Sequence, residues 1–412
     1  MVLFGLISRK EKPIKKSSFY LDASFFEGKF NAMIFNCKKL ELSEAIVNVS
    51  KAVPSKSSIP QLEGIKVLLN GNMLTLTGYN LELGITTSVL VENASSNGEA
   101  DQDGYIINAR IFSEMIKKMP SDDINVSINL NGSMKAKIKA GSTNCNIAVL
   151  SAKDYPELPN TSNGDTVVVS QSTLKSMISE TIYAVSTNDV KPILTGELFD
   201  IDHNSFNLVA IDGKRLAIRH EAISYGDTLS FVVPAKTLAE ISHLLKDDAT
   251  ADCKIVSAIR HIMFQIGKYT IISRLLEGEF HNYKGSIPTE NNTEAIVKVK
   301  ELTECLDRCS LLINEKNRAP VKLKFGDNSL KITCETPLGN IDETINVKTT
   351  QSQSQELVIG LNNKFLLDAL KASNTDQVKI LMNSPIKPVL LVPMQSDSFT
   401  FLLMPIQIRE NR

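Results

Sequence analysis

Residues 64–68 (Gly-Ile-Lys-Val-Leu) and residues 72–76 (Asn-Met-Leu-Thr-Leu) are two short runs in which apolar residues alternate with other residues. Polar turn residues separate the two runs, and this combination predicts a β-hairpin. The same pattern returns at residues 196–208 and at 321–332, although the third copy lacks the first glycine. Asn72, Asn204 and Asn328 mark the same point of the pattern, roughly 130 residues apart. The hairpin therefore belongs to a unit that occurs three times.

Each hairpin lies between two helical patterns. The helix before it is predicted at residues 40–53, 172–185 and 299–313, and the helix after it at 109–119, 235–245 and 362–372. In residues 172–185, for example, Leu174, Met177, Ile178, Ile182 and Val185 recur at helical spacing. Further strand patterns follow each second helix. The fold class is therefore α+β, with three repeated two-helix, antiparallel-sheet domains.

Polar, proline-bearing stretches around residues 156–165 and 288–292 are interpreted as linkers. They predict domains at residues 33–160, 166–288 and 293–412. Residues 1–32 are basic and differ in character from the rest. We expect them to be a disordered or non-native N-terminal extension, with Met33 as the natural start; a targeting presequence is the alternative.

Composition is ordinary for a globular protein, with 42% hydrophobic and 22% charged residues among 412. The net charge of -1 does not exclude nucleic-acid binding, because opposite charges can occupy different faces. The six cysteines include no Cys-x-x-Cys pair, so we expect reduced thiols and a cytoplasmic location. No apolar run is long enough to span a membrane, and no membrane partner is expected.

Sequence motifs for catalysis are missing: there is no phosphate-binding GxxxxGK[ST], no HExxH, no GxSxG and no zinc-spaced cluster of cysteine and histidine. Cys305 and Cys309, four residues apart, are better explained as part of a core-facing stripe than as metal ligands. We therefore expect no cofactor, no metal and no enzymatic activity. An enzyme with an unrecognised site remains an alternative, which a perturbed carboxylate pair in a deep pocket would favour.

The second helices share a charge layout. Their basic residues are Arg110, Lys117, Lys118, Lys236, His243, Lys246, Lys364 and Lys371, and each helix also carries one acid, at Glu114, Glu240 or Asp368. On a single helix this pattern is typical of a solvated face. Repeated three times, it predicts a basic stripe that contacts phosphates without reading bases.

Several segments together resemble one family. They are residues 74–82 (LTLTGYNLE), 208–217 (LVAIDGKRLA), 232–236 (VVPAK), 314–316 (NEK) and 402–406 (LLMPI). In this order, over residues 33–409, the chain resembles the bacterial DNA sliding clamp, the beta subunit of DNA polymerase III. The resemblance implies a DNA clamp fold and a ring-forming head-to-tail homodimer that encircles duplex DNA without sequence preference.

In function, the resemblance implies a non-catalytic processivity factor of DNA replication. Its partners would be the DNA polymerase III alpha subunit, the clamp loader and other clamp-binding-motif proteins, all held through a peptide-binding cleft. A scaffold built from the same repeat, which binds proteins without encircling DNA, is the alternative; it would lack a closed ring.

The resemblance also implies site residues. The partner-peptide cleft would comprise Leu194, Ile211, Gly213, Lys214, Arg215, Leu216, Leu402, Leu403, Met404, Pro405 and Ile406, and Arg215 could anchor a polar group of the peptide. The DNA contacts implied by the resemblance would be Lys56, Asn188 and Lys191, to which the basic stripe adds Arg110 and Lys236, and the dimer contacts would be Leu311, Leu312 and Cys145. The chain departs from the family at the cleft edge, through His281, Gly285 and Gln407, which leaves its peptide preference open.

Overall fold

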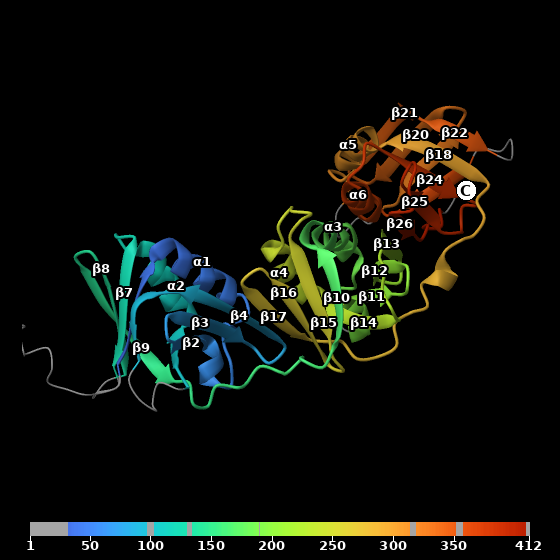
Figure 1. Ribbon diagram of the computed structural model, residues 1–412. Coiled ribbons are helices and arrows are strands. Elements are labelled where there is room, and N and C mark those ends of the chain that lie inside the picture. The colour runs from blue at the N-terminus through green and yellow to red at the C-terminus, as the bar shows by residue number, and fades with distance from the viewer. Residues whose placement is uncertain are drawn as a thin grey trace, which may run out of the picture.

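The computed structural model describes residues 32–96, 103–129, 134–188, 190–313, 319–351 and 357–408. The predicted N-terminal extension lies outside the described residues except for Ala32, and so does the family-like segment at residues 314–316. Figure 1 shows the chain as three units along an arc, with the six labelled helices on its concave side and the sheets behind them.

All six predicted helices are present. The helices before the hairpins are α1 (Lys39–Ser50), α3 (Gln171–Thr181) and α5 (Val299–Cys309), and those after them are α2 (Ala109–Lys118), α4 (Ala235–Leu244) and α6 (Asn363–Ala372). Asn108 and Asn362 begin α2 and α6 because their side chains accept a hydrogen bond from the backbone of the helix. The first helices end earlier than predicted, since tighter turns, such as the short 3-10 helix η4 (Ile182–Ala184), replace their last residues.

The three predicted hairpins are also present. They are β2 (Gly64–Asn70) with β3 (Met73–Tyr79), β11 (Gly196–Ile201) with β12 (Ser205–Ile211), and β19 (Val321–Gly326) with β20 (Ser329–Thr336). The pairings Asn70↔Met73 and Gly326↔Ser329 are equivalent, so the first and third units share one register. Alternation of side chains between the two faces of each strand explains why the sequence pattern had period two.

The remaining strands complete the units. The first unit adds β1 (Ala32–Lys38), β4 (Leu83–Leu90), β5 (Glu92–Ser95), β6 (Tyr105–Asn108), β7 (Asp123–Asn129), β8 (Lys135–Ala140) and β9 (Thr143–Ser151). The second adds β10 (Asp165–Ser170), β13 (Arg215–Ala222), β14 (Leu229–Pro234), β15 (Asp252–Ser257), β16 (His261–Ile266) and β17 (Tyr269–Arg274). The third adds β18 (Thr293–Lys298), β21 (Gly339–Asn346), β22 (Lys348–Gln351), β23 (Leu357–Leu361), β24 (Gln377–Met382), β25 (Val389–Val392) and β26 (Phe399–Leu403).

Neighbouring units are joined by shared sheets. β4 of the first unit pairs antiparallel with β17 of the second, and β13 of the second pairs with β26 of the third. The two junctions are therefore built in the same way, and each hydrogen-bonds across the boundary between units. Backbone pairing of this kind makes each junction more rigid than a contact between side chains alone.

The helices bury their apolar faces against the sheets. Cys305 and Cys309 are both buried in the core of the third unit, as the core-facing interpretation predicted. The described residues include no helix long and apolar enough to cross a membrane.

Two glutamates of the second unit are buried, Glu180 and Glu197, and Glu197 is the more deeply buried. Glu197 of β11 is 0% exposed, and burial raises its pKa to about 8. The hydroxyl of Thr181 is 2.9 Å from one carboxyl oxygen of Glu197 and 2.7 Å from the carbonyl oxygen of Met177. When the hydroxyl of Thr181 donates to Met177, a protonated Glu197 can donate to the oxygen of Thr181, which accommodates the neutral acid.

We expect stability to fall as pH rises from about 4.5 to about 8, because the unfolded state releases the proton of Glu197 in this range and the native state keeps it. Glu197→Gln should remove this loss and raise the free energy of unfolding by about 3 kcal/mol at pH 7. Urea unfolding at pH 5 and at pH 8 would measure it, with the more exposed Glu221→Gln as the control. Equal pH dependence in wild type and Glu197→Gln would contradict the assignment.

Candidate functional site

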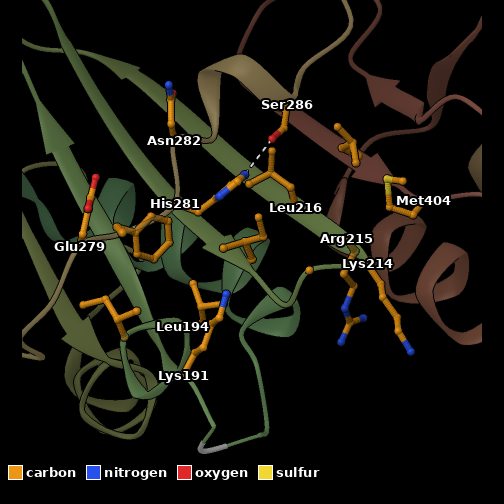
Figure 2. Close-up of a pocket in the computed structure, with 15 residues that line it drawn as sticks. Lys191, Leu194, Lys214, Arg215, Leu216, Glu279, His281, Asn282, Ser286 and Met404 are labelled. Atoms are coloured by element: carbon orange, nitrogen blue, oxygen red, sulfur yellow. Dashed lines mark hydrogen bonds between the residues drawn. The ribbon is translucent and has the colours of Figure 1, made fainter.

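A cleft of about 500 Å³ lies where the second and third units meet (Figure 2). Its lining comes from the short helix η5 (Pro192–Thr195), the turn between β12 and β13, the connector after β17, and the end of β26. The lining residues are Lys191, Ile193, Leu194, Ile211, Gly213, Lys214, Arg215, Leu216, Glu279, Phe280, His281, Asn282, Ser286, Leu402 and Met404.

Strand register explains the apolar floor of the cleft. Leu216 pairs with Ile211 on one side and with Leu402 on the other, so side chains from three adjacent strands meet. The turn beside them is tight: Asp212 Oδ1 accepts hydrogen bonds from the backbone nitrogens of Lys214 and Arg215, at 2.8 and 3.0 Å. Gly213 has φ 86°, a left-handed conformation that favours glycine.

Most of the cleft residues expected from the family resemblance line this cavity: Leu194, Ile211, Gly213, Lys214, Arg215, Leu216, Leu402 and Met404. Leu403, Pro405 and Ile406 are not among the lining residues. Leu402 and Leu403 are neighbours in β26, so their side chains point to opposite faces of the sheet. The side chain of Leu403 is buried in the core of the third unit. After β26 the chain turns away, because the backbone nitrogen of Ile406 donates to the carbonyl of Gly360 at 2.8 Å.

The side chain of Arg215, the residue expected to anchor a polar group of the peptide, also makes contacts within the protein. Its side chain is only 9% exposed, and its guanidinium pairs with Asp212 at 2.9 Å and with Asp368 at 2.8 Å. The rings of Tyr183 and Phe365 lie 5.3 and 4.3 Å from it. In Figure 2 the guanidinium is turned away from His281 and Ser286. Its Nε and Nη1 atoms therefore bond within the protein, whereas Nη2 has no hydrogen-bond partner among the described residues.

One wall of the cleft was missed by the sequence-based residue set. The connector supplies Glu279, Phe280, His281, Asn282 and Ser286, and the ring of His281 hydrogen-bonds Ser286 at 3.0 Å. The only sequence signal was the family-like position of residues 280–285, since no periodicity marks an irregular segment. The connector is held by the hydroxyl of Tyr283, which donates to Asp200 at 2.6 Å.

The residues expected to contact DNA are all exposed: Lys56, Arg110, Asn188, Lys191 and Lys236. Arg110 and Lys236 occupy the second position of α2 and α4, and Lys364 occupies the same position of α6. Lys191 also lines the cleft, which the sequence did not predict.

The acid one turn later on each of these helices neutralises part of the basic stripe. Glu114 pairs with Lys117 and Lys118, and Asp368 pairs with Lys364. Glu240 instead pairs with Lys51 at the end of α1, across the junction of the first two units, at 3.1 Å. Arg110 and Lys236 form no ion pair with another described residue. Among the described lysines and arginines of α2, α4 and α6, these two are therefore the most available to an outside anion.

The residues expected at the dimer contact lie at opposite ends of the chain. Leu311 is 80% exposed, whereas Leu312 is half-buried and packs on the core of the third unit. Cys145 is partly buried in β9 of the first unit. On α2, Ile111 is 42% exposed beside Met115, and both border an open concavity with Arg110, Glu114 and Lys118.

Comparison with known families and proteins agrees with this architecture. Residues 33–159, 168–282 and 284–407 match the N-terminal, central and C-terminal domains of the DNA polymerase III beta subunit. The chain is 34% identical over 368 residues to the beta sliding clamp of Halalkalibacterium halodurans, covering 87% of this chain and 96% of that protein.

Solved structures agree as well. A putative DNA polymerase III beta subunit from Eubacterium rectale is similar with a TM-score of 0.83 at 30% identity, covering 91% of this chain and 99% of that one. The DNA polymerase sliding clamp of Bacillus subtilis has a TM-score of 0.84 at 28% identity, covering 92% and 100%. Three matching domains in order, an identity above 30% over nearly a whole relative and a shared fold lead to one conclusion: the chain belongs to the DNA polymerase III beta subunit family, the sliding clamps.

Proposed function

We propose that two copies of this chain close head to tail into a ring around duplex DNA. In this role the chain is a non-catalytic processivity factor, which tethers the DNA polymerase III alpha subunit, the clamp loader and other proteins through the cleft. The observation that carries the proposal is the arc of three equivalent units with helices on its concave side. If the head-to-tail contact repeats the geometry of the junctions within the chain, the assembly closes into a ring when the rotations from unit to unit add up to a full circle.

The repeat supplies a register for the contact between chains. β9 is the counterpart of β17, and β21 is the counterpart of β4, because their hairpins have equivalent registers. Ile271 of β17 pairs with Ile85 of β4. By the same geometry, Cys145 of β9 would pair with Ile341 of the partner subunit. Among described strands β21 pairs only with β20, so its other edge is available.

The helices support the same contact. Leu311 stands where Lys51 stands in the first unit, and Glu114 stands where Glu240 stands in the second. The Lys51–Glu240 ion pair would thus be replaced between chains by Leu311 packed on the α2 surface of Ile111 and Met115. An exposed leucine and an exposed apolar helix face would each be buried, which is favourable at about 25 cal/mol per Å² of apolar surface.

The central test concerns topology. Protein loaded by a relative's clamp loader onto nicked circular plasmid should stay bound through gel filtration. Cutting the plasmid once should release it, because a ring leaves DNA only over an end. A protein-binding scaffold that does not encircle DNA would show equal retention before and after cutting, and that result would contradict the proposal.

Direct DNA contacts should be weak and salt-dependent, because phosphates supply them. We expect Lys236→Ala and Arg110→Ala each to weaken binding of a short duplex about two- to fivefold at low salt, without sequence preference, and to reduce the dependence on salt. Fluorescence anisotropy over a salt series would measure it. Lys387→Ala is the matched control, since Lys387 lies beside the connector at Pro288. Equal losses in all three variants would speak against a helix-borne DNA face.

A further inference from the structure

The sheet of the first unit carries a row of lysines on one strand. In β8 the side chains of Lys135, Lys137 and Lys139 are exposed, and the residues between them are buried. Ile138, for example, lies in the same core as Phe112 of α2. Because side chains alternate between the two faces of a strand, the three lysines point away from the helices. In Figure 1, β8 lies at the end of the arc that is far from the second unit.

The strands on both sides of β8 place uncharged polar groups beside these lysines. The residues that pair with Lys137 and Lys139 are Asn144 and Asn146 of β9, and Asn125 and Ser127 of β7. The acid at the start of β7, Asp123, is 2.6 Å from the ammonium group of Lys38. Within the part of the chain that the structure describes, none of the three lysines of β8 forms an ion pair. We call this surface the lysine face; it comprises Lys135, Lys137, Lys139, Asn144 and Asn146.

The usual structural roles of lysine in a sheet do not explain the row. Lysines often protect an edge strand from pairing with another chain, but β8 lies between β7 and β9. Lysines on strands also form ion pairs across the sheet, and those of the third unit do so. There, Lys322 is 3.2 Å from Glu335, and Lys331 is 2.7 Å from Asp342. The lysine face has neither feature.

The repeat supplies an internal comparison. In β8, Ile138 pairs with Cys145 of β9. In the second unit, Phe264 of β16 pairs with Ile271 of β17, so β16 is the counterpart of β8. The positions of the three lysines are taken in β16 by His261, Met263 and Gln265. The fold of the unit therefore does not require lysine at these positions, and the row is a property of the first unit.

The spacing of the three ammonium groups suits a row of anions. Alternate residues of a strand are roughly 6.8 Å apart, so neighbouring lysines repel each other when no anion is bound. A nucleic-acid strand carries one negative charge per phosphate at comparably short intervals. Lysine and asparagine are among the side chains that bind phosphate oxygens without reading bases. The lysine face thus matches a phosphate backbone in charge, in spacing and in the type of donor.

Other anionic partners fit this surface less well. Interfaces between proteins are poor in lysine and rich in aromatic residues, and β7, β8 and β9 contain no aromatic residue. Bases of single-stranded nucleic acid also stack on aromatic rings. A membrane surface is bound by basic faces that carry large apolar side chains, whereas the neighbours of Lys137 and Lys139 are polar. The backbone of a duplex requires none of these features.

We propose that the lysine face binds the phosphate backbone of a segment of duplex DNA that lies outside the ring. The position outside the ring rests on the proposed function, in which the helices line the hole, but the binding itself does not. The ring would then hold two segments of duplex at once, one in the hole and one against β8. The contact between chains uses the edge of β9, so it leaves the lysine face accessible.

Capture of a second duplex by a loaded ring tests the proposal. Protein would be loaded onto nicked circular plasmid, purified by gel filtration and mixed with a short fluorescent linear duplex, whose anisotropy reports capture. The hole is already filled, so the labelled duplex can bind only outside, and plasmid without protein gives the background. The lysine-face variant combines Lys135→Thr, Lys137→Thr and Lys139→Thr, because threonine suits a strand. The matched control removes three exposed lysines elsewhere, through Lys254→Thr, Lys348→Thr and Lys387→Thr.

We expect wild type and the control to capture the duplex at low salt, and the lysine-face variant to bind it about five- to tenfold more weakly. The slope of log affinity against log salt should become shallower by about two to three, since each phosphate contact contributes about 0.9. Equal capture by the lysine-face variant and the control would show that the proposal is wrong. Binding of a polyglutamate peptide or of phosphatidylglycerol vesicles to this face, without binding of the duplex, would overturn it as well.

Retention on the plasmid separates this proposal from the proposed function. The lysine-face variant should be retained on the uncut circle as wild type is, because the lysine face is not in the hole. If wild type is not retained, the ring has failed, and the lysine face is tested on the free chain instead. There, adding the three threonine substitutions to Arg110→Ala, Lys236→Ala protein should weaken the remaining duplex binding about five- to tenfold. Unchanged binding would contradict the lysine face alone.

Discussion

Leu311→Asp should convert the ring into single chains. Each ring has two contacts between chains, and in each the aspartate would lie against Ile111 and Met115 of the partner subunit, beside its Glu114, the counterpart of the Glu240 that pairs with Lys51. Burying an unpaired carboxylate costs several kcal/mol, on the order of 3 kcal/mol per contact, and the apolar contact of leucine is lost in addition. Sedimentation velocity at micromolar concentration would detect the change as a shift from dimer to monomer.

Leu311 is well suited to this test because it is 80% exposed in the single chain, so its replacement leaves the core of the third unit intact. Leu312 is half-buried, and a charge there would destabilise that unit as well as the contact. Ile259→Asp is the control, because Ile259 is 99% exposed on the turn between β15 and β16. A Leu311→Asp protein that stays dimeric at nanomolar concentration would contradict the proposed interface.

Met404→Ala combined with Leu194→Ala should reduce the affinity of partner peptides more than tenfold, which corresponds to about 1.4 kcal/mol or more. The two side chains line the cleft from opposite units, so the double variant removes apolar contact on both sides. Peptide affinity at such sites comes from a few buried anchors. Anisotropy with peptides that carry leucine and phenylalanine would measure the loss, at an unchanged melting temperature.

Ile406→Ala is the matched control, since Ile406 is 36% exposed, follows Met404 closely and does not line the cleft. Removal of the whole end of the chain would be a poorer test, because Ile406 pairs with Gly360 and its loss would also expose the edge of β23. Unchanged peptide affinity in a folded Met404→Ala, Leu194→Ala protein would mean that peptides dock elsewhere.

The structure locates the three residues at which the chain departs from the family at the cleft edge. His281 lies in the connector wall and hydrogen-bonds Ser286, while Gly285 and Gln407 are not lining residues. A change in peptide preference would therefore arise at the His281 side of the cleft. Lys191, Lys214 and Glu279 also line the cavity, so their charges would add to that preference.

The sequence by itself determined the repeat, the six helices and the three hairpins. These follow from local forces: apolar residues at a period of 3.6 or two, polar turn residues, and caps such as Asn108 and Asn362. It also indicated the two segments that meet at the cleft, because the turn at Asp212 and the end of β26 each carry family-like residues. The repeat, the helices, the hairpins and the family-like residues can all be recognised without knowing which segments come together in space.

Only the tertiary structure decided which side chains face the cleft and what each one touches. Leu402 lines the cleft and Leu403 the core because β26 pairs with β13 in one register, and a shift by one residue would exchange them. Arg215 pairs with Asp368, 153 residues away, so no local pattern could show this pairing. The exposure of Leu311 and the burial of Leu312 likewise depend on how the end of α5 packs on the third unit, because the two residues are chemically the same and only long-range packing distinguishes them.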